Sequence, residues 1–206
     1  MRIAKGCWSW VLPPLLLSLF FFIASWYNTW FLTVFIPVFC VLVFFLFFFR
    51  DPERTIGDGV VSPADGKIRD IQNENNQILI SIFMEVNNVH VNRMPLDGRI
   101  TKMTHFPGYH LRAWKKESDL NERVISTVGT AIGQVTILQI AGLIARRVYP
   151  YIKDGDELKK GDRIGIIRLG SRVDVILPAD KVQSVSVQIG DPVKAGQDTI
   201  AILKEK

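Results

Sequence analysis

The fold is decided by a stretch that occurs twice, Gly155-Asp156-Glu157-Leu158-Lys159-Lys160-Gly161 and Gly190-Asp191-Pro192-Val193-Lys194-Ala195-Gly196. Paired glycines at this spacing suit turns that need a positive φ, with Leu158 or Val193 pinned inward between them. An apolar run follows each copy. Each copy therefore predicts a tight turn that leads into a β-strand.

The residues around these turns continue the same pattern. From Gly59 onward, short β-type runs alternate with Gly, Pro, Asp and Asn, and long helical periodicity is absent after residue 50. We therefore predict a mainly β soluble domain, whose turn-strand units look like those of barrel-sandwich domains that carry lipoyl or biotinyl groups. The predicted strands are Gly66–Gln72, Gln77–Met84, Arg99–His105, Glu122–Val128, Gly133–Ile140, Arg163–Ile167, Val173–Leu177, Gln183–Val187 and Thr199–Leu203.

The N-terminal part is different in character. Two apolar runs, Val11–Tyr27 and Trp30–Phe49, are separated only by Asn28-Thr29, and each is near the roughly 20 residues that span a bilayer as a helix. The pattern predicts a hydrophobic helical hairpin that anchors residues 1–50 in the cell membrane. Basic residues flank both of its ends: Arg2, Lys5, Arg50 and Arg54. We therefore expect residues 51–206 on the cytoplasmic side, whether the hairpin crosses fully or re-enters.

Charge and composition narrow the class of protein. The net charge of +5 fits a surface that meets anionic lipid head groups. No arginine-rich run or helix-turn-helix pattern occurs, so we expect no nucleic-acid partner. Cys7 and Cys40 match no metal or redox spacing, and the three histidines are too scattered to predict a metal site. No Walker or Rossmann glycine pattern predicts a nucleotide cofactor.

Four stretches, taken in order, carry a family resemblance. They are Phe49-Arg50-Asp51-Pro52-Glu53-Arg54, Val61-Ser62-Pro63-Ala64-Asp65-Gly66-Lys67, Asn88-Val89-His90-Val91-Asn92-Arg93-Met94-Pro95 and Leu169-Gly170-Ser171-Arg172-Val173-Asp174-Val175. The ordered set closely resembles the phosphatidylserine decarboxylase proenzymes, in particular the short form found in many prokaryotes. Asn121-Glu122-Arg123 and Gln139-Ile140-Ala141-Gly142 also look like family segments, so the resemblance covers nearly the whole chain.

The resemblance implies that the chain cuts itself between Gly170 and Ser171. The Ser171 hydroxyl would attack the carbonyl of Gly170, which a residue without a side chain leaves open. Elimination and hydrolysis would then turn Ser171 into a covalent pyruvoyl group, the only cofactor expected. The products would be a β chain of residues 1–170 and an α chain that begins at residue 171, held together as a heterodimer.

A serine hydroxyl needs a base to become a good nucleophile. The resemblance implies an Asp-His-Ser arrangement in which Asp65 orients the imidazole of His90. Longer family members have a second histidine at the position of Arg93, so it stays open whether His90 serves both cleavage and decarboxylation. His105 and His110 are weaker candidates for a functional role.

The implied reaction is decarboxylation of phosphatidylserine, or of its ether-linked counterpart archaetidylserine, a membrane phospholipid in either case. The pyruvoyl group would form a Schiff base with the substrate amine and accept the electron pair that the carboxylate leaves. His90 would protonate the substrate carbon. Arg50, Arg54 and Arg93 are candidates for binding the lipid phosphate, because a guanidinium can grip phosphate with two hydrogen bonds.

A second interpretation from another class also fits the turn pattern. A non-enzymatic lipoyl- or biotinyl-like module bound to the membrane would carry its group on an exposed lysine, and Lys181 is the nearest candidate. Such a carrier would stay in one piece, whereas the decarboxylase would yield two. The sequence leaves the lipid tails and the oligomeric state, including a homo-oligomer, open.

Overall fold

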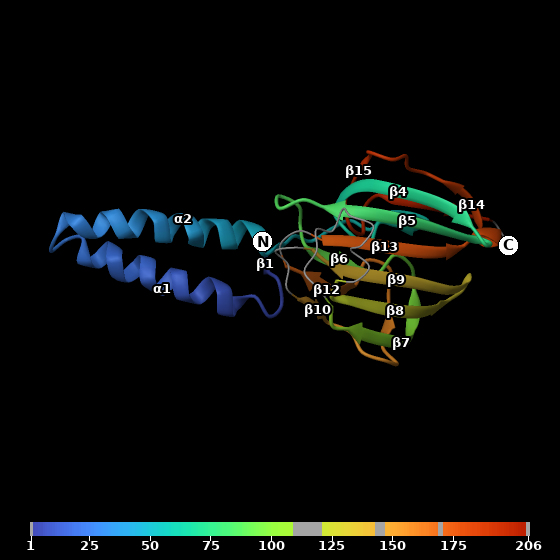
Figure 1. Cartoon of the computed structure of the whole chain (residues 1–206), viewed down its shortest axis with the longest axis horizontal. Helices are drawn as coiled ribbons and strands as arrows, with labels where there is room; N and C mark the ends of the chain where they lie inside the picture. The colour runs from blue at the N-terminus through green and yellow to red at the C-terminus, as the bar shows by residue number, and fades with distance from the viewer. Residues whose placement is uncertain (1, 109–120, 143–146, 169–170, 205–206) are drawn as a thin grey trace. The chain divides into compact units, whose positions relative to one another are not determined.

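A computed structural model describes residues 2–108, 121–142, 147–168 and 171–204. The chain forms two compact units, Met1–Glu53 and Arg54–Lys206, drawn in Figure 1. The first unit is helical and the second is built from β-strands. The prediction of a mainly β protein with an N-terminal helical hairpin is therefore confirmed.

The helical unit is a hairpin of α1 (Trp8–Ala24) and α2 (Leu32–Phe48), joined through the short 3-10 helix η1 (Thr29–Phe31). At the turn, the Asn28 side chain accepts a hydrogen bond from the amide of Trp30 at 3.0 Å. The strands β1 (Arg2–Ile3) and β2 (Arg50–Asp51) pair antiparallel at the other end of the hairpin.

The first helix begins at Trp8, earlier than the apolar run that starts at Val11 had indicated. Its extra turn is stabilised by aromatic packing, because the Trp10 ring lies 5.9 Å from that of Phe45 and 6.4 Å from that of Phe49.

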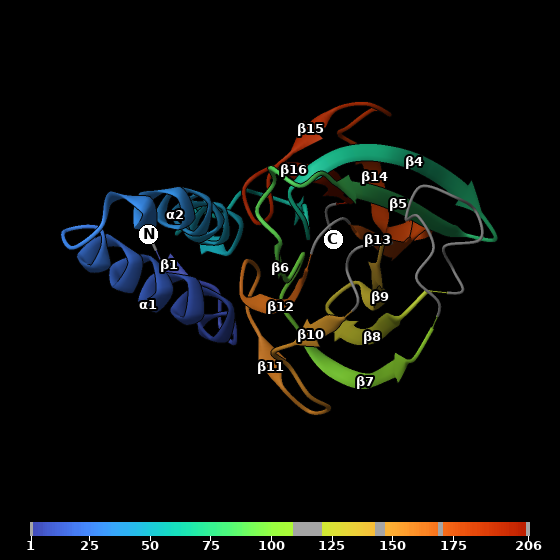
Figure 2. The same ribbon diagram turned by 60° about the vertical axis from the view of Figure 1, so that its left-hand side comes forward.

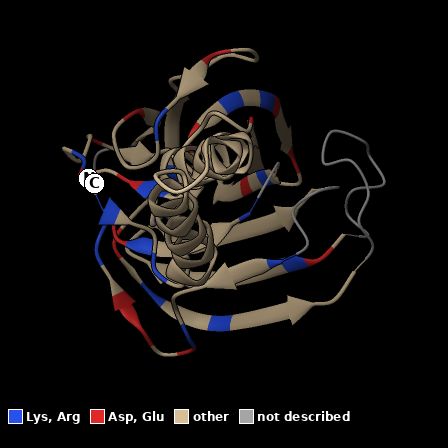
Figure 3. Cartoon of the chain, turned by 90° about the vertical axis from the view of Figure 1, so that its left-hand side faces the viewer, with Lys and Arg blue, Asp and Glu red and all other residues tan. Residues whose placement is uncertain are grey.

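The hairpin has the surface of a membrane segment. The helix Thr29–Phe48 is long and apolar enough to cross a membrane, and Trp8–Ala24 is a shorter apolar helix. Neither α1 nor α2 contains Lys, Arg, Asp or Glu, so both ribbons are uniformly tan in Figure 3. The side chains of Trp26 and Tyr27 at the turn are 80% and 90% exposed.

The second unit is organised around an antiparallel eight-stranded sheet, in the order β11-β7-β8-β9-β13-β5-β4-β15. The sheet curves strongly (Figure 2), yet among the described residues its edge strands do not pair with each other, so no closed barrel forms. Its strands are β4 (Gly66–Glu74), β5 (Gln77–Met84), β7 (Gly98–Phe106), β8 (Arg123–Thr130), β9 (Gly133–Ala141), β11 (Glu157–Leu158), β13 (Ser171–Pro178) and β15 (Pro192–Val193).

Two three-stranded sheets complete this unit, in the orders β10-β12-β6 and β14-β16-β3. Their strands are β3 (Val60–Val61), β6 (Val91–Arg93), β10 (Val148–Pro150), β12 (Arg163–Ile167), β14 (Val182–Val185) and β16 (Thr199–Leu203). Every strand predicted from the sequence overlaps an observed one, and β5, β12 and β16 have the predicted bounds. The sequence missed β3, β6, β10, β11 and β15, because two or three residues are too few to show a period.

The two copies of the glycine stretch lie at the two edges of the eight-stranded sheet. Its four flanking glycines have φ values of +89°, +88°, +98° and +75°, which confirms the predicted left-handed turns. Within the turns lie β11 and β15, which pair with β7 and β4. The amides of Gly155 and Gly190 each donate at 2.8 Å, to the carbonyls of Ile100 and Ile68. The two copies therefore occupy equivalent places.

A second repeat, missed in the sequence, matches the first. Ser62-Pro63-Ala64-Asp65-Gly66-Lys67-Ile68 corresponds to Met94-Pro95-Leu96-Asp97-Gly98-Arg99-Ile100. Asp65 accepts a hydrogen bond from the amide of Ala195 at 2.8 Å, and Asp97 accepts one from the amide of Lys160 at 2.7 Å. Each aspartate therefore fastens one glycine stretch to the sheet.

A side chain at Gly66 should destabilise the fold, because its Cβ would clash with the carbonyl oxygen of Phe83 on the neighbouring strand. We expect Gly66→Ala to lower the free energy of unfolding by about 2 kcal/mol. Urea unfolding of the full chain in detergent measures this. Gly129→Ala is the control: its Cβ would lie 3.3 Å from the Thr101 methyl and 3.9 Å from the carbonyl oxygen of Arg99. Equal stability of the two variants would contradict the packing.

Candidate active site

Ser171 is the first residue of β13, where it pairs with Met84 of β5 on one side and Ala141 of β9 on the other. It lies on the same face of the strand as the core residues Val173 and Val175, because side chains alternate along a strand. Its side chain is fully buried, and its Oγ donates a hydrogen bond to Met84 Sδ at 3.1 Å. The sheet register thus holds the hydroxyl inside the protein.

A buried row of polar side chains continues from Met84. Asn92 Nδ2 donates to Met84 Sδ at 3.6 Å, and Gln139 Nε2 donates to Asn92 Oδ1 at 2.8 Å. Asn92 and Gln139 are at most 1% exposed. Burying amides is costly unless they are paired, so this row ties β5, β6 and β9 together behind Ser171. The sequence did not predict these roles, because the pair of Asn92 and Gln139 joins two strands that are far apart along the chain.

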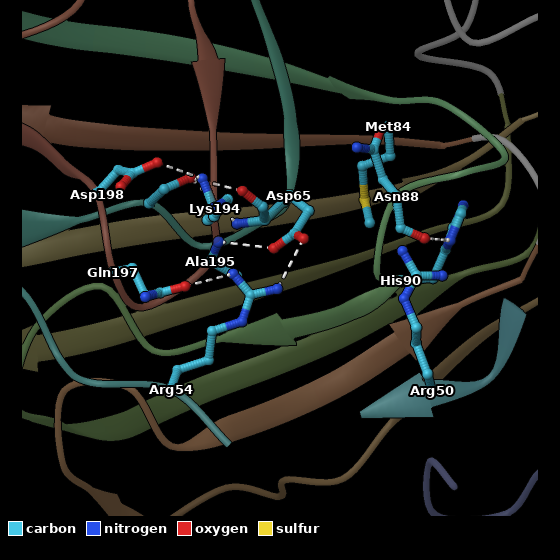
Figure 4. Close-up of polar contacts among 12 residues, drawn as sticks. Arg50, Arg54, Asp65, Met84, Asn88, His90, Lys194, Ala195, Gln197 and Asp198 are labelled. Carbon is cyan, nitrogen blue, oxygen red and sulfur yellow. Dashed lines mark hydrogen bonds and ion pairs between the residues drawn. The ribbon is translucent and has the colours of Figure 1, made fainter. Parts of the chain in front are cut away.

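His90 is fully buried and immediately precedes β6. Its carbonyl accepts a hydrogen bond from the amide of Ile167, the last residue of β12, at 3.3 Å. Its ring Nδ1 lies 3.0 Å from the carbonyl oxygen of Asn88, as the dashed line in Figure 4 shows. Since a carbonyl can only accept, a hydrogen bond here requires the proton on Nδ1, which in a neutral imidazole leaves the lone pair on Nε2.

Asp65 forms a different set of contacts from the one that the family resemblance implied. Its Oδ2 forms an ion pair with Arg54 Nη2 at 2.8 Å, and its Oδ1 accepts the amide of Ala195 (Figure 4). Arg54 also donates to Gln197 Oε1 at 3.0 Å. The side chains of Arg54 and Asp65 are 7% and 9% exposed, so this ion pair is buried.

Among the described residues, no hydrogen bond or ion pair joins Asp65 to His90, so the structure does not assemble the Asp-His arrangement. The sheet order also separates Asp65 from Ser171. Asp65 precedes β4, and β5 lies between β4 and β13. Two strand spacings, about 9 to 10 Å, therefore separate the start of β4 from Ser171.

The three arginines suggested for phosphate binding have contacts of their own. Arg93 is 4% exposed and donates to the carbonyl of Gly161 at 2.9 Å, and Arg54 is committed to Asp65. Arg50 donates to the carbonyl of Phe47 at 2.7 Å, with its guanidinium 3.9 Å from the centre of that ring. Their binding of a lipid phosphate stays a prediction.

The remaining candidates lie around the same end of the sheet or outside the described residues. His105 Nε2 lies 3.0 Å from Glu122 Oε1, which also accepts the amide of Val148 at 3.1 Å. Asn121 Nδ2 donates to the carbonyl of Ala141, the ladder partner of Ser171, at 2.8 Å. Gly170 and His110 lie outside the described residues.

A buried serine that begins a strand and a buried imidazole are residue types that an enzyme can use as a reacting group and as a base. Comparison with known proteins identifies the family. Residues 41–201 match the family model described as phosphatidylserine decarboxylase. The chain therefore belongs to the phosphatidylserine decarboxylase family.

Curated relatives with two different names are almost equally similar to this chain. A phosphatidylserine decarboxylase proenzyme of Streptomyces avermitilis is 40% identical over 95% of this chain and 91% of its own length. A protein of Halobacterium salinarum named "Putative archaetidylserine decarboxylase proenzyme" is 40% identical over 97% of this chain and 99% of its own. A protein of that name from Methanococcoides burtonii is 39% identical, over 97% and 95%.

The internal repeat provides a matched test of the buried ion pair. Asp65→Asn should lower the free energy of unfolding by about 3 kcal/mol, because it leaves the buried Arg54 guanidinium without its counter-charge. Asp97→Asn should cost less than about 1 kcal/mol, since the Asp97–Lys159 pair is exposed. Urea unfolding in a Ser171→Ala background, which keeps the chain whole, measures both. Equal losses would show that the Arg54 pair adds nothing to the turn contact that both aspartates make.

Proposed function

We propose that this chain is a proenzyme that cuts itself before Ser171, carries a pyruvoyl group made from that serine, and then decarboxylates a serine phospholipid. Membership of the family supports the decarboxylation. The burial of Ser171 at the first position of β13 is the single observation that supports the self-cleavage, because it removes the hydroxyl from bulk water.

The conversion of Ser171 into a pyruvoyl group consumes one water molecule and needs no oxidant or reductant. Ser171 Oγ bonds to the carbonyl carbon of residue 170 while its proton leaves, and the C–N bond breaks to give an ester and a free amine. Removal of the Cα proton then breaks the Cβ–Oγ bond and releases the carboxylate of residue 170. Water converts the resulting dehydroalanine into the pyruvoyl group and ammonia.

His90 is the residue that we assign to proton transfer. Its Nδ1–H donates to the carbonyl of Asn88, which leaves Nε2 as the nitrogen able to take a proton. Met84 Sδ, the hydrogen-bond acceptor for Ser171 Oγ, is too weak a base for this task. Asp65 stays a predicted contributor, and its contacts give it a part in holding Arg54 and the Ala195 turn.

The residues around Ser171 fit a pyruvoyl group. The group would use the Cα and Cβ of Ser171 itself, in the space between Met84 and Ala141, and would need no added volume. It would supply a carbonyl that reacts with the substrate amine and draws electrons from the bond to the carboxylate. The chain's own part is to hold residue 171 between β5 and β9 and to exclude bulk water. His90 would donate a proton to the substrate carbon.

The helical hairpin supports a membrane location. A two-chain lipid stays in the bilayer, so an enzyme acting on its head group must work at the membrane surface. The uncharged helices suit lipid, and the basic residues at both ends favour the cytoplasmic side. After cleavage, the parts before and after residue 171 would remain a heterodimer, since β13 lies between β5 and β9.

The lipid is defined here by its serine head group. Relatives named for the diacyl lipid and for the ether lipid are 40% identical to this chain. The chemistry takes place on the serine, so we propose activity on both lipids. The carrier alternative gains no support, since Lys181 ends a short 3-10 helix, η3 (Ala179–Lys181), and pairs with Asp180 at 3.1 Å.

Purified wild-type chain should appear as two fragments, divided before residue 171, and should release carbon dioxide from phosphatidylserine in mixed micelles. Ser171→Ala should stay whole and inactive. His90→Ala should slow cleavage about 100-fold or more, the usual contribution of a general base. Gel electrophoresis over time and a carbon dioxide assay measure these effects. His105→Ala is the control and should cut normally, and a whole, active wild type would refute the proposal.

A further inference from the structure

The turn between β5 and β6 is closed by one residue, Asn88. Its amide donates to the carbonyl of Glu85 at 3.0 Å, and its side-chain Oδ1 accepts the amide of Glu85 at 2.7 Å. The main chain of Asn88 therefore binds the carbonyl of Glu85, and its side chain binds the amide of Glu85, the first residue of the turn. Asn favours such turns because its short side chain can bond to nearby backbone.

The same residue holds the ring of His90. The carbonyl of Asn88 accepts the Nδ1 proton at 3.0 Å (Figure 4), while the carbonyl of His90 is tied to the amide of Ile167. At the other end of the turn, Met84 contacts Ser171 Oγ. The turn thus links the position of the imidazole to the strand that holds the serine.

In hydrolase triads a carboxylate accepts the Nδ1 proton and fixes the orientation of the imidazole. Here Asp65 is bound to Arg54 and to the amide of Ala195, and a backbone carbonyl accepts that proton instead. A neutral acceptor orients the ring without burying a second charge beside it.

We propose that Asn88 is the positioning residue of His90. Its side chain fixes the turn, the turn aims the Asn88 carbonyl at Nδ1, and this keeps Nε2 as the nitrogen that exchanges protons. One part of this inference rests on the proposed function, namely that His90 transfers protons in the reaction. The tautomer itself is a property of the uncut chain.

The first test measures the tautomer directly, by ¹⁵N NMR of histidine-labelled, full-length Ser171→Ala protein in detergent. The chain has three histidines, so His90→Ala identifies the signal. We expect the Nδ1–H form in the starting protein, a shift toward the other tautomer in Asn88→Ala, and its return in Asn88→Asp, which keeps the Oδ1 acceptor. Asn87→Ala, at the exposed neighbouring position, is the matched control and should change nothing. An Nε2–H ring in the starting protein, or no change in Asn88→Ala, overturns the proposal.

The second test measures the rate of self-cleavage in the chain with Ser171 intact. Asn88→Ala should cut about 10- to 100-fold more slowly, the usual effect of misplacing a reacting group by about 1 Å. Asn88→Asp should recover most of the rate, and Asn87→Ala should match the wild type. Asn88→Gln, which keeps the amide at the wrong reach, replaces Asn88→Ala if the latter does not fold.

The outcomes separate the two proposals. A folded Asn88→Ala that cuts at the wild-type rate overturns the positioning role and leaves the proposed function standing. A wild type that never cuts overturns the proposed function, and the tautomer measurement then decides the role of Asn88 by itself.

Discussion

Ser171 enters the eight-stranded sheet between Met84 and Ala141, and the ladders on its two sides are the constraint on which the site depends. Strand alternation turns its side chain toward the core, where no water competes for the hydroxyl. In the proposed cleavage, the pairs that Arg172 and the following residues make with β5 and β9 would keep β13 in the sheet, because they do not involve the peptide before residue 171. A reacting group made from the chain itself therefore needs a strand that is central in its sheet, as β13 is.

The internal repeat explains how this sheet ends and where the site lies. Each of the two glycine stretches adds a two-residue strand to one edge of the sheet, where it pairs with the first two residues of β7 or β4. The two aspartates that fasten them have diverged: Asp97 pairs with a lysine at the surface, whereas Asp65 is buried against Arg54. The two aspartates thus occupy equivalent places in the fold and differ in burial. Asp65, the buried one, lies just before β4, which pairs with β5, the strand that ends at Met84.

The sequence predicted the parts of the structure that have a period or a turn signal. Alternating apolar residues located the long strands, and paired glycines located the two edge turns. It did not predict which strands are neighbours, so it could not predict that Asp65 would contact Arg54 and the Ala195 turn, whereas His90 precedes a strand of another sheet. The pairing of Asn92 with Gln139 joins strands that are far apart along the chain, and no local pattern reports such a contact. The bond of Asn88 to Glu85 is local, but its effect on His90 is visible only in the structure.

The family gives the chemical class, while the register of β13 and the tautomer of His90 describe how this chain can perform it. The most direct test is mass spectrometry of the C-terminal fragment, with and without a carbonyl reagent such as hydroxylamine. The account predicts a fragment whose first residue, number 171, has lost its amine, carries a ketone and gains the mass of one reagent molecule. A fragment that begins with an ordinary serine and does not react would contradict it.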